Sequence, residues 1–428
     1  MKIMNKTYMK RLVDELIARR LKAIGAVLID GPKWCGKTTT GLNACRSVLY
    51  MQDPTTIKRN IEISEVEPAI LLEGNTPRLI DEWQLAPKLY DAIRFEIDKR
   101  NEFGQFIMTG SSTPVNLKNI NHTGTGRIAR IQMRTMSLWE SLESTGEVSF
   151  AELFNGRTDV KGFNNKKLKD IAYVICRGGF PGSIGLDKED ALMVPYNYYD
   201  SIISREIINV DNVNRDKEKI KKLMKSLARN IASTVKIPTI IKDIKMYDNE
   251  NISDITIASY ITALRNIFVL EDLNAWNPNI RSKTSIRTTS TKYFVDPSIA
   301  VAAQGLGPND LINDLNTFGI LFENLCVRDL RIYSEVLDGE LYKYRDARGL
   351  ECDAVIHLRN GKYGLIEIKL GGDKLIEDGV KTLQEFEKII DTDRMNKPAF
   401  KMIITAVGDY AYKRKDDIII TPISCLKV

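Results

Sequence analysis

The sequence predicts an α/β fold with a parallel sheet in its N-terminal part, a helical middle and a second α/β domain at its C-terminal end. One observation is that apolar runs at residues 26–29, 78–81 and 106–109 alternate with helical patterns, as in a parallel sheet. Another is a pair of strand patterns at residues 351–358 and 362–370, which an Asn-Gly turn joins into an antiparallel hairpin. Helical spacing between these parts predicts the helical middle.

The predicted elements of the N-terminal part follow from local patterns. Residues 7–20 have helical spacing with a basic face and are expected to form an entry helix. The strand at 26–29 leads through a glycine-rich turn into a helix at 39–49. A second strand, an amphipathic helix at 88–100 and a third strand complete the order, so the strands are expected to be parallel.

The glycine-rich turn matches the pattern G-x-x-x-x-G-K-[ST] at every position. The segment is Gly31, Pro32, Lys33, Trp34, Cys35, Gly36, Lys37 and Thr38, followed by Thr39. Such a loop turns its N–H groups around a phosphate, and the next helix directs its positive end to the same place. Lys37 is predicted to reach the β- and γ-phosphates of ATP, and the hydroxyl of Thr38 to bind Mg²⁺. An ordinary glycine-rich turn between a strand and a helix is the alternative.

Acidic and polar residues end the next two predicted strands. Since parallel strands present their carboxyl ends at one edge of the sheet, Asp81 is expected beside the loop, holding Mg²⁺ through water or through Thr38. Glu82 is predicted to orient and deprotonate the attacking water. Ser111 is predicted to contact the γ-phosphate or that water. The alternatives are a surface Asp-Glu pair and an ordinary Gly-Ser-Ser turn.

Residues 20 to about 140 resemble an AAA+ ATPase core. The resemblance rests on the phosphate loop and on Leu79-Ile80-Asp81-Glu82, Thr109-Gly110-Ser111-Ser112 and Gly124-Thr125-Gly126-Arg127. It implies ATP hydrolysis and an arginine near the γ-phosphate, supplied by the same chain or by a neighbouring subunit. Arg127 is the residue that the resemblance favours, and a solvated basic face that includes Arg130 and Arg134 is the alternative.

Nearly the whole chain also resembles prokaryotic ATPases in which this core precedes a winged helix and a C-terminal domain of unknown function similar to PD-(D/E)xK nucleases. The implied domains are residues 1–140 for the core, 141–214 for a helical lid or linker, 215–305 for the winged helix and 306–428 for the nuclease-like domain.

The predicted winged helix is strongly basic. Residues 215–245 hold ten lysines and arginines against three acidic residues, a net charge of +7, whereas the whole chain carries +6. A third helix after Ser253 would present Ser259, Thr262 and Arg265 to DNA, with basic residues neutralising phosphates. A hairpin-like stretch with Arg281, Lys283, Arg287 and Lys292 would form the wing. A role as a lid or as a contact between domains is the alternative.

The C-terminal part holds a second group of charged residues. If the apolar even-numbered residues of both hairpin strands face one core, Asp353, Glu367 and Lys369 project from the opposite face, which requires an odd loop or a bulge. With Glu323 on a preceding helix, they form the elements of the PD-(D/E)xK pattern, although Cys352 stands where the strict motif has proline. They predict a second site for Mg²⁺ or Mn²⁺. An inactive nuclease-like fold and a plain polar face of a hairpin stay open.

Composition limits the class of protein. The 428 residues are 43% hydrophobic and 28% charged, as in globular proteins, and hold no apolar run long enough to span a membrane. The six cysteines form no metal-like or paired motif and are expected to be reduced thiols in a cytoplasmic protein. The expected partners are ATP, DNA or a protein and further copies of the chain, with no membrane.

Three functions remain open at this point. The first is a Mg²⁺-dependent ATPase that repositions the winged helix and the nuclease-like domain on DNA. The second is an ATP-gated switch with slow turnover that acts on a protein partner. The third is a metal-dependent DNA nuclease.

Overall fold

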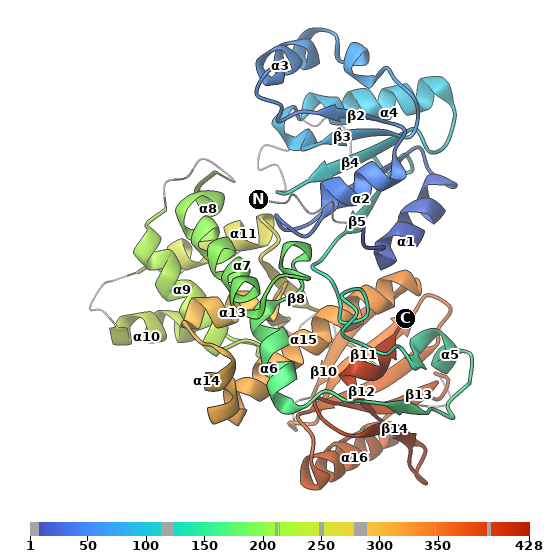
Figure 1. Ribbon diagram of the computed structural model, residues 1–428, viewed down its shortest axis with the longest axis vertical. Coiled ribbons are helices and arrows are strands. Elements are labelled where there is room, and N and C mark those ends of the chain that lie inside the picture. Colours follow the sequence, from blue (N-terminus) through green and yellow to red (C-terminus); the bar gives the residue numbers. More distant parts are fainter. Residues whose placement is uncertain are drawn as a thin grey trace. The chain divides into compact units, whose positions relative to one another are not determined.

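The computed structural model describes residues 8–112, 124–209, 213, 215–247, 252–277, 289–346, 348–391 and 395–428. The chain divides into two compact units. The first comprises Met1–Thr135, Ser204–Asn214 and Thr262–Val269, and the second comprises Met136–Ile203, Arg215–Ile261 and Leu270–Val428. Figure 1 labels their elements. The predicted α/β class, with a parallel sheet, a helical middle and a C-terminal mixed sheet, is confirmed.

The first unit is built on a five-stranded sheet with the order β2-β3-β4-β1-β5. All of its neighbouring strands are parallel. The strands are β1 (Ala26–Asp30), β2 (Ser47–Tyr50), β3 (Arg78–Asp81), β4 (Phe106–Gly110) and β5 (Ile128–Gln132). The helices are α1 (Leu12–Leu21), α2 (Lys37–Ala44), α3 (Ile57–Val66), η1 (Pro68–Leu72), η2 (Trp83–Leu85) and α4 (Lys88–Arg100).

Central strand β1 is buried along its whole length because both faces of the sheet are covered. Leu28 joins a core that contains Ile93 of α4. Val27 joins the core on the other face, which contains Ile17 of α1. Successive side chains of a strand point to opposite faces, so a continuous apolar run is what this position requires. The sheet therefore holds the ends of β1, β3 and β4 in a fixed register.

One local expectation was wrong. The helix expected at 39–49 begins at Lys37 and ends at Ala44, and Ser47–Tyr50 is an additional strand that pairs with β3. A Val-Leu-Tyr run has a high propensity for a strand. The pairing of this strand with β3 outweighs the helical pattern of the sequence here. Within the alternative of a solvated basic face, Arg130 lies in strand β5 with its side chain 57% exposed, whereas Arg134 is buried.

The second unit begins with β6 (Val148–Ser149), α5 (Phe150–Phe154), β7 (Gly162–Phe163), α6 (Leu168–Arg177), η4 (Pro181–Ser183) and α7 (Lys188–Ser201). A π-helical segment, Ile202–Glu206, and α8 (Ile207–Asn209) follow at the boundary between the units. Next come α9 (Lys217–Arg229), α10 (Ile237–Tyr247), α11 (Asp254–Asn266), β8 (Leu270–Leu273), β9 (Thr291–Phe294), α13 (Pro297–Gln304), α14 (Pro308–Asn313) and α15 (Leu315–Val336).

A seven-stranded mixed sheet in the order β10-β11-β12-β13-β15-β14-β7 forms the C-terminal part. Its further elements are β10 (Gly339–Arg345), β11 (Glu351–Leu358), β12 (Tyr363–Lys369), α16 (Asp373–Lys388), β13 (Phe400–Thr405), β14 (Tyr410–Lys413), β15 (Ile418–Pro422), η6 (Ile423–Cys425) and β16 (Leu426–Lys427). The predicted hairpin is present, since β11 and β12 are antiparallel neighbours.

The segment expected as a helical lid also contributes strands to this sheet region. Gly162 and Phe163 pair with β14, and Val148 and Ser149 pair with β16. Such two-residue strands leave no period in the sequence, so only the long-range pairing reveals them.

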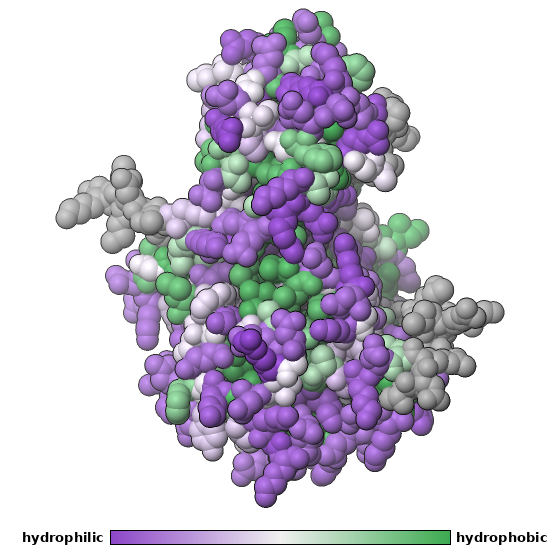
Figure 2. Space-filling view, turned by 90° about the vertical axis from the view of Figure 1, so that its right-hand side faces the viewer, coloured by the Kyte–Doolittle hydropathy of each residue, from purple (hydrophilic) through white to green (hydrophobic). Residues whose placement is uncertain are grey.

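The exterior of the chain carries both hydrophilic and hydrophobic residues. The face shown in Figure 2 is covered mostly by hydrophilic residues, with smaller hydrophobic areas between them. In the described ranges, no helix is both long enough and apolar enough to cross a membrane.

Candidate nucleotide site and a second charged cluster

The glycine-rich loop connects the end of β1 to the start of α2, as predicted. A Cβ at Gly31 would lie 2.1 Å from the carbonyl oxygen of Met133, so only glycine fits there. Gly36 precedes the helix with φ 101°, a left-handed conformation that favours glycine. The two glycines thus allow a tight turn that ends at a helix N-terminus, the geometry of an anion site.

Lys37 lies inside this loop. Its side chain is buried, and Nζ donates hydrogen bonds to the carbonyl oxygens of Gly31, at 2.9 Å, and Pro32, at 2.8 Å. Both acceptors are backbone atoms of the loop itself. The ammonium group is therefore held at the centre of the turn, where a phosphate group would exchange places with the two carbonyls.

The other loop residues differ in exposure. Lys33 forms an ion pair of 2.7 Å with Glu206, and Trp34 is exposed with a positive φ of 65°. Cys35 is buried, and its carbonyl oxygen accepts a 2.8 Å hydrogen bond from Arg11. Thr39 is exposed. The outer part of the loop is thus presented to solvent while its inner part is anchored.

Asp81 lies beside the loop, where its position at the end of β3 predicts it. Its carboxylate is fully buried and accepts hydrogen bonds from Thr38, at 2.7 Å, Thr109, at 2.7 Å, and Gln52, at 3.2 Å. Thr38 and Asp81 therefore present two oxygen ligands side by side, which fits the preference of Mg²⁺. Thr109 and Gln52 were not predicted; Gln52 follows strand β2, which the sequence pattern did not reveal.

Glu82 and Ser111 are also brought together. The Glu82 carboxylate accepts a 2.8 Å hydrogen bond from the Ser111 hydroxyl and another from the side-chain amide of Gln84. Glu82 has φ 58°, and its N–H donates to the hydroxyl of Thr109 at 3.2 Å. A positive φ in a residue other than glycine is costly and is often found at functional sites. Gln84 is a further member of the site that the sequence reasoning missed.

Arg127 is not close to the loop of its own chain. It directly precedes β5, and its carbonyl oxygen accepts the N–H of Ala26 at the start of β1, whereas the loop follows the other end of β1. A five-residue strand spans about 16 Å. The side chain forms a 2.7 Å ion pair with Asp98 instead. The role expected for Arg127 within the same chain is therefore not supported by this geometry, and a role toward a neighbouring subunit stays a prediction.

Arg130, in contrast to Arg127, contacts the residue that precedes the loop. It donates two hydrogen bonds, of 2.9 and 2.7 Å, to the same oxygen of Asp30, the last residue of β1. Burial raises the pKa of Asp30, and the positive charge of Arg130 opposes that rise. The spacing of the arginines in the sequence gave no means of distinguishing Arg130 from Arg127.

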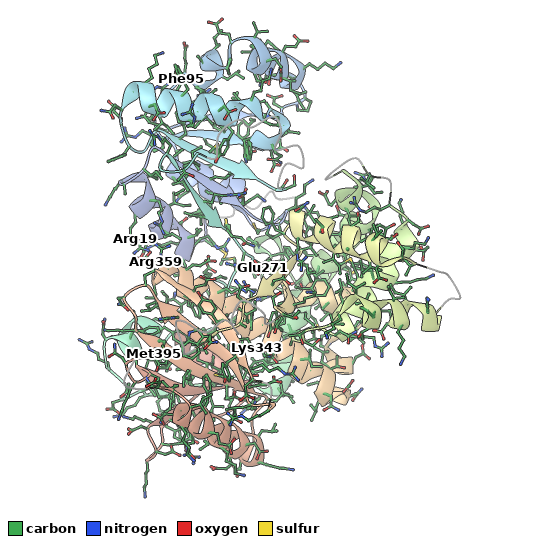
Figure 3. The ribbon with its side chains drawn as sticks, turned by 180° about the vertical axis from the view of Figure 1, so that it is seen from behind. Arg19, Phe95, Glu271, Lys343, Arg359 and Met395 are labelled. Carbon is green, nitrogen blue, oxygen red and sulfur yellow. The ribbon has the colours of Figure 1, made fainter. Side chains whose placement is uncertain are left out.

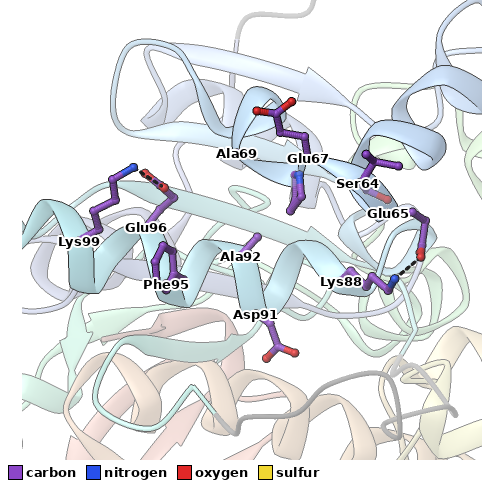
Figure 4. A pocket seen from close by; sticks show the side chains of 12 residues that line it. Ser64, Glu65, Glu67, Ala69, Lys88, Asp91, Ala92, Phe95, Glu96 and Lys99 are labelled. Atoms are coloured by element: carbon purple, nitrogen blue, oxygen red, sulfur yellow. Dashed lines mark hydrogen bonds and ion pairs between the residues drawn. The ribbon is translucent and has the colours of Figure 1, made fainter.

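A hollow in the first unit lies apart from these residues. A groove of about 660 Å³ runs between the α3–η1 segment and α4 and is lined by Ala92, Phe95 and charged residues (Figure 4). Lys88 and Glu65 form an ion pair across one end of it. The groove contains none of the predicted site residues.

The second charged cluster assembles in the C-terminal part. Lys369 contacts Asp353, at 3.3 Å, and Glu367, at 2.6 Å. Glu323 of α15 accepts hydrogen bonds from Lys343, at 2.7 Å, and from the hydroxyl of Tyr293, at 2.6 Å. All four predicted residues are thus brought into one network. Lys343 was missed because β10 was not assigned as a strand, and Tyr293 was missed because its segment was predicted only as a wing of the winged helix.

The odd hairpin loop that the strand parity requires is present, because even-numbered residues of β11 pair with even-numbered residues of β12 across residues 359–361. A β-bulge in the neighbouring strand pair also shapes this cluster. The pairing of β11 with β12 keeps one register, with Ala354 opposite Ile366, whereas the pairing of β10 with β11 shifts between Tyr342 and Tyr344. Next to this bulge, Asp353 accepts the N–H of Ile368 at 2.9 Å. Bulges often redirect side chains next to functional sites.

The electrostatics of the cluster reflect its burial. Burial, together with the charge of Asp353, raises the pKa of Glu367 to about 8, and burial also raises the pKa of Glu323. For Lys343, burial works to lower the pKa, but the carboxylates of Glu323 and Asp353 outweigh it and raise the pKa. Asp353, Glu367 and Lys369 also line a cleft of about 750 Å³ beside α16.

The basic middle region has the predicted order of three helices and an antiparallel strand pair, α9, α10, α11, β8 and β9. Arg215 is buried and donates to Ser259 at 3.4 Å, so neither side chain is simply displayed to solvent. Thr262 is exposed, and Arg265 is half-buried. Lys292 is paired with Asp272 at 3.4 Å, and the predicted wing residues Arg281, Lys283 and Arg287 lie outside the described residues.

Comparison with protein families assigns the N-terminal part. Residues 24–142 match the model of an AAA domain. Residues 24–142 are an AAA-type ATPase domain. This family match includes the glycine-rich loop, Asp81, Glu82 and Ser111. Residues 168–310 and 318–426 match two domains of unknown function, DUF8612 and DUF4143.

Two solved structures are similar to parts of this chain. AMPPCP-bound DnaA from Aquifex aeolicus is 12% identical, with a TM-score of 0.29, over 62% of this chain and 93% of that chain. A signal transduction ATPase with numerous domains and a tetratricopeptide repeat sensor, from Pyrococcus horikoshii, is 14% identical, with a TM-score of 0.25, over 77% of this chain and 50% of that chain. No curated protein matches significantly.

Proposed function

We propose that this ATPase is Mg²⁺-dependent and uses the hydrolysis of ATP to reposition a basic winged helix, together with its C-terminal domain, on DNA. The observation that carries the ATPase chemistry is the convergence of Lys37, Thr38, Asp81 and Glu82 at one edge of the sheet. Neither carboxylate is adjacent to the loop in sequence, so their proximity is a property of the fold.

Each residue has a role that follows from its contacts. Lys37 exchanges the loop carbonyls for the β- and γ-phosphates. Thr38 would hold Mg²⁺ through its hydroxyl, and Asp81 would hold it through water or through Thr38. When bound, Mg²⁺ would neutralise part of the phosphate charge. Glu82 releases its hydrogen bond with Ser111 and then orients and deprotonates the attacking water. Ser111 then contacts the γ-phosphate or that water.

The proposed action on DNA rests on the charge of α9 and α10. Lysines and arginines are exposed along both helices, namely Lys217, Lys221, Lys225 and Arg229 on α9 and Lys242 and Lys245 on α10. Exposed cations bind phosphates without reading sequence, and release of counterions makes that binding depend steeply on salt. The exposure of Thr262 on α11 supports contact of this third helix with base edges.

An ATP-gated switch that acts on a protein partner is the second candidate. One observation favours it: Glu82 is restrained by Ser111 and Gln84, which slows turnover if the restraint persists after ATP binds. The two functions differ in turnover. A switch binds ATP tightly with negligible hydrolysis, whether or not DNA is present.

Steady-state hydrolysis of ATP, with and without Mg²⁺ and duplex DNA, tests the proposal. We expect hydrolysis that needs Mg²⁺ and changes with DNA, and at least tenfold weaker ATP binding in the Lys37→Ala variant. If Lys37→Ala binds and hydrolyses ATP like the parent, the assignment of the loop is wrong. Tight binding with no turnover under any condition would select the switch.

The proposed binding of DNA requires a separate variant. Charge reversal at Lys217, Lys221 and Lys225 removes three exposed cations and should reduce the slope of log affinity against log salt by about 3. The matched control reverses Lys374 and Lys381, two exposed lysines of α16. Binding that is insensitive to salt, or equally weakened in the control, contradicts a DNA role for α9.

A further inference from the structure

The charged cluster of the C-terminal part alternates negative and positive groups. Starting from Tyr293, the contacts run through Glu323, Lys343, Asp353 and Lys369 to Glu367. Lys343, labelled in Figure 3, is 7% exposed and contributes its ammonium group from strand β10. Two ammonium groups therefore stand between three carboxylates.

The carboxylate oxygens of Asp353 and Glu367 are already engaged by the protein. One oxygen of Asp353 lies 3.8 Å from Nζ of Lys343, and the other accepts from the N–H of Ile368 and from Lys369. One oxygen of Glu367 accepts the N–H of Asp353 at 3.4 Å, and the other accepts from Lys369. A divalent cation binds oxygens that can all turn toward it, so this donor set does not fit one.

Lys343 occupies the decisive position. A metal held by the nuclease pattern would draw on Asp353 together with Glu367 and Glu323, and Nζ of Lys343 lies 2.7 Å from Glu323 and 3.8 Å from Asp353. In the parts of the chain that the structure describes, no group of three or more His, Cys, Asp or Glu side chains is arranged to hold a metal. A buried carboxylate pair needs a compensating cation, and the lysine supplies it.

We propose that Lys343 is the resident cation of this cluster, so that the C-terminal part binds no divalent metal here and is not a metal-dependent nuclease. The inference is independent of the ATPase proposal, because it concerns residues of a different sheet. Removal of the ammonium group should also leave converging carboxylates to which a divalent ion can bind.

Binding of Mn²⁺ to the nucleotide-free full chain tests this proposal, with free Mn²⁺ followed by electron paramagnetic resonance. The parent and Asp353→Asn should bind the same number of ions, because neither holds Mn²⁺ in the cluster. Lys343→Met should gain one site, and the double variant Lys343→Met with Asp353→Asn should lose it again. Mn²⁺ should also raise the Tm of Lys343→Met without raising that of the parent.

A matched control removes both partners of the buried pair. Lys343→Met combined with Glu323→Gln leaves no excess carboxylate charge beside the methionine and should not gain tight Mn²⁺ binding. If Lys343→Met folds and gains no site, the proposal is wrong. If that variant does not fold, the parent and Asp353→Asn decide the matter alone: one additional Mn²⁺ in the parent, or Mn²⁺-dependent DNA cleavage lost on Asp353→Asn, overturns the proposal, and equal binding without cleavage supports it.

Discussion

Thr38 and Asp81, 43 residues apart in the chain, are joined by a 2.7 Å hydrogen bond from hydroxyl to carboxylate. The bond connects the first turn of α2 to the end of β3, and Asp81 is held at the same time by Thr109 of β4. The two oxygen ligands proposed for Mg²⁺ are thus positioned by a helix and two strands. Ligands held on regular elements lose little freedom when a metal binds, which is the condition for precise placement.

Glu82→Gln should separate ATP binding from hydrolysis. Glutamine retains the size of the side chain and can still contact Ser111 and Gln84, but it cannot take a proton from water. Loss of a general base typically lowers the rate by about 10²- to 10⁴-fold. We therefore expect kcat to fall by that order while binding of a fluorescent ATP analogue changes little. Exposed Glu62→Gln on α3 is the control, and a parental kcat in Glu82→Gln would remove this carboxylate from the chemistry.

The Gly110→Ala substitution should disturb the same site by displacing buried side chains next to Glu82. A Cβ at Gly110 would lie 2.9 Å from Nε1 of Trp83, 3.1 Å from Oδ1 of Asp30 and 3.3 Å from Oε1 of Gln84. These three buried atoms have no hydrogen-bond partner among the residues that the structure describes. The methyl group must displace them, and Gln84 in turn supports Glu82. Misplacement of a catalytic group by 1 Å can cost about 10²-fold in rate.

The measurement is kcat beside ATP affinity and thermal stability. We expect kcat to fall more than affinity, and the free energy of unfolding to fall by about 1–3 kcal/mol from overpacking. Gly182→Ala is the matched control, because a Cβ there meets nothing within 4 Å. Parental turnover in Gly110→Ala would show that the atoms around Gly110 do not position Glu82.

Much of the nucleotide site was predictable because it depends on short patterns. The loop fixes Lys37 and Thr38 by its own spacing, and a strand that ends in Asp-Glu fixes Asp81 through the common edge of a parallel sheet. Gln52 and Gln84 were not predictable in this way. Both depend on β2 and η2, short elements whose existence is decided by pairing and packing rather than by a local period.

The C-terminal cluster shows the same division. The hairpin and its Asn-Gly turn gave Asp353, Glu367 and Lys369 a common location from strand alternation alone. Lys343 was missed because nothing in residues 339–345 distinguishes its lysine from other charged residues of a polar strand. It becomes significant only once β10 pairs with β11 and its ammonium group lies beside Glu323 and Asp353.

Asp329 should make stability depend on pH in the second unit. Its carboxylate is buried and accepts hydrogen bonds from Arg328, at 2.9 Å, and from the N–H of Leu138, at 2.9 Å. Burial raises its pKa to about 6, and the charge of Arg328 only partly opposes this. Between pH 4 and 6 the unfolded chain releases this proton while the folded chain keeps it, so stability falls as pH rises, by about 3 kcal/mol in total.

Asp329→Asn cannot ionise and should lack this dependence. We expect the free energy of unfolding of the variant, relative to the parent, to rise by about 3 kcal/mol between pH 4 and pH 7, measured by urea denaturation. Exposed Glu189→Gln on α7 serves as the control for a general charge effect. A constant difference between variant and parent across this range is the result that excludes a raised pKa.

Arg127 should act across a subunit contact if it acts in hydrolysis. Its position at the start of β5, with its side chain paired to Asp98, leaves it about one strand length from the loop of its own chain. An arginine supplied to the γ-phosphate is worth about 10³- to 10⁵-fold in rate. ATP hydrolysis by the Arg127→Ala variant should therefore be strongly impaired. In the parent, the specific ATPase activity should rise with protein concentration as subunits associate.

Mixing two inactive variants tests this directly. Lys37→Ala retains Arg127 but not the ATP site, and Arg127→Ala retains the ATP site but not the arginine, so a mixed assembly joins one intact loop to one intact arginine. We expect the mixture to hydrolyse ATP faster than either variant alone, and a mixture of Lys37→Ala with Glu82→Gln to stay inactive, because both of those lesions lie in the same site. Full activity of Arg127→Ala alone would instead make Arg127 a surface partner of Asp98 with no part in hydrolysis.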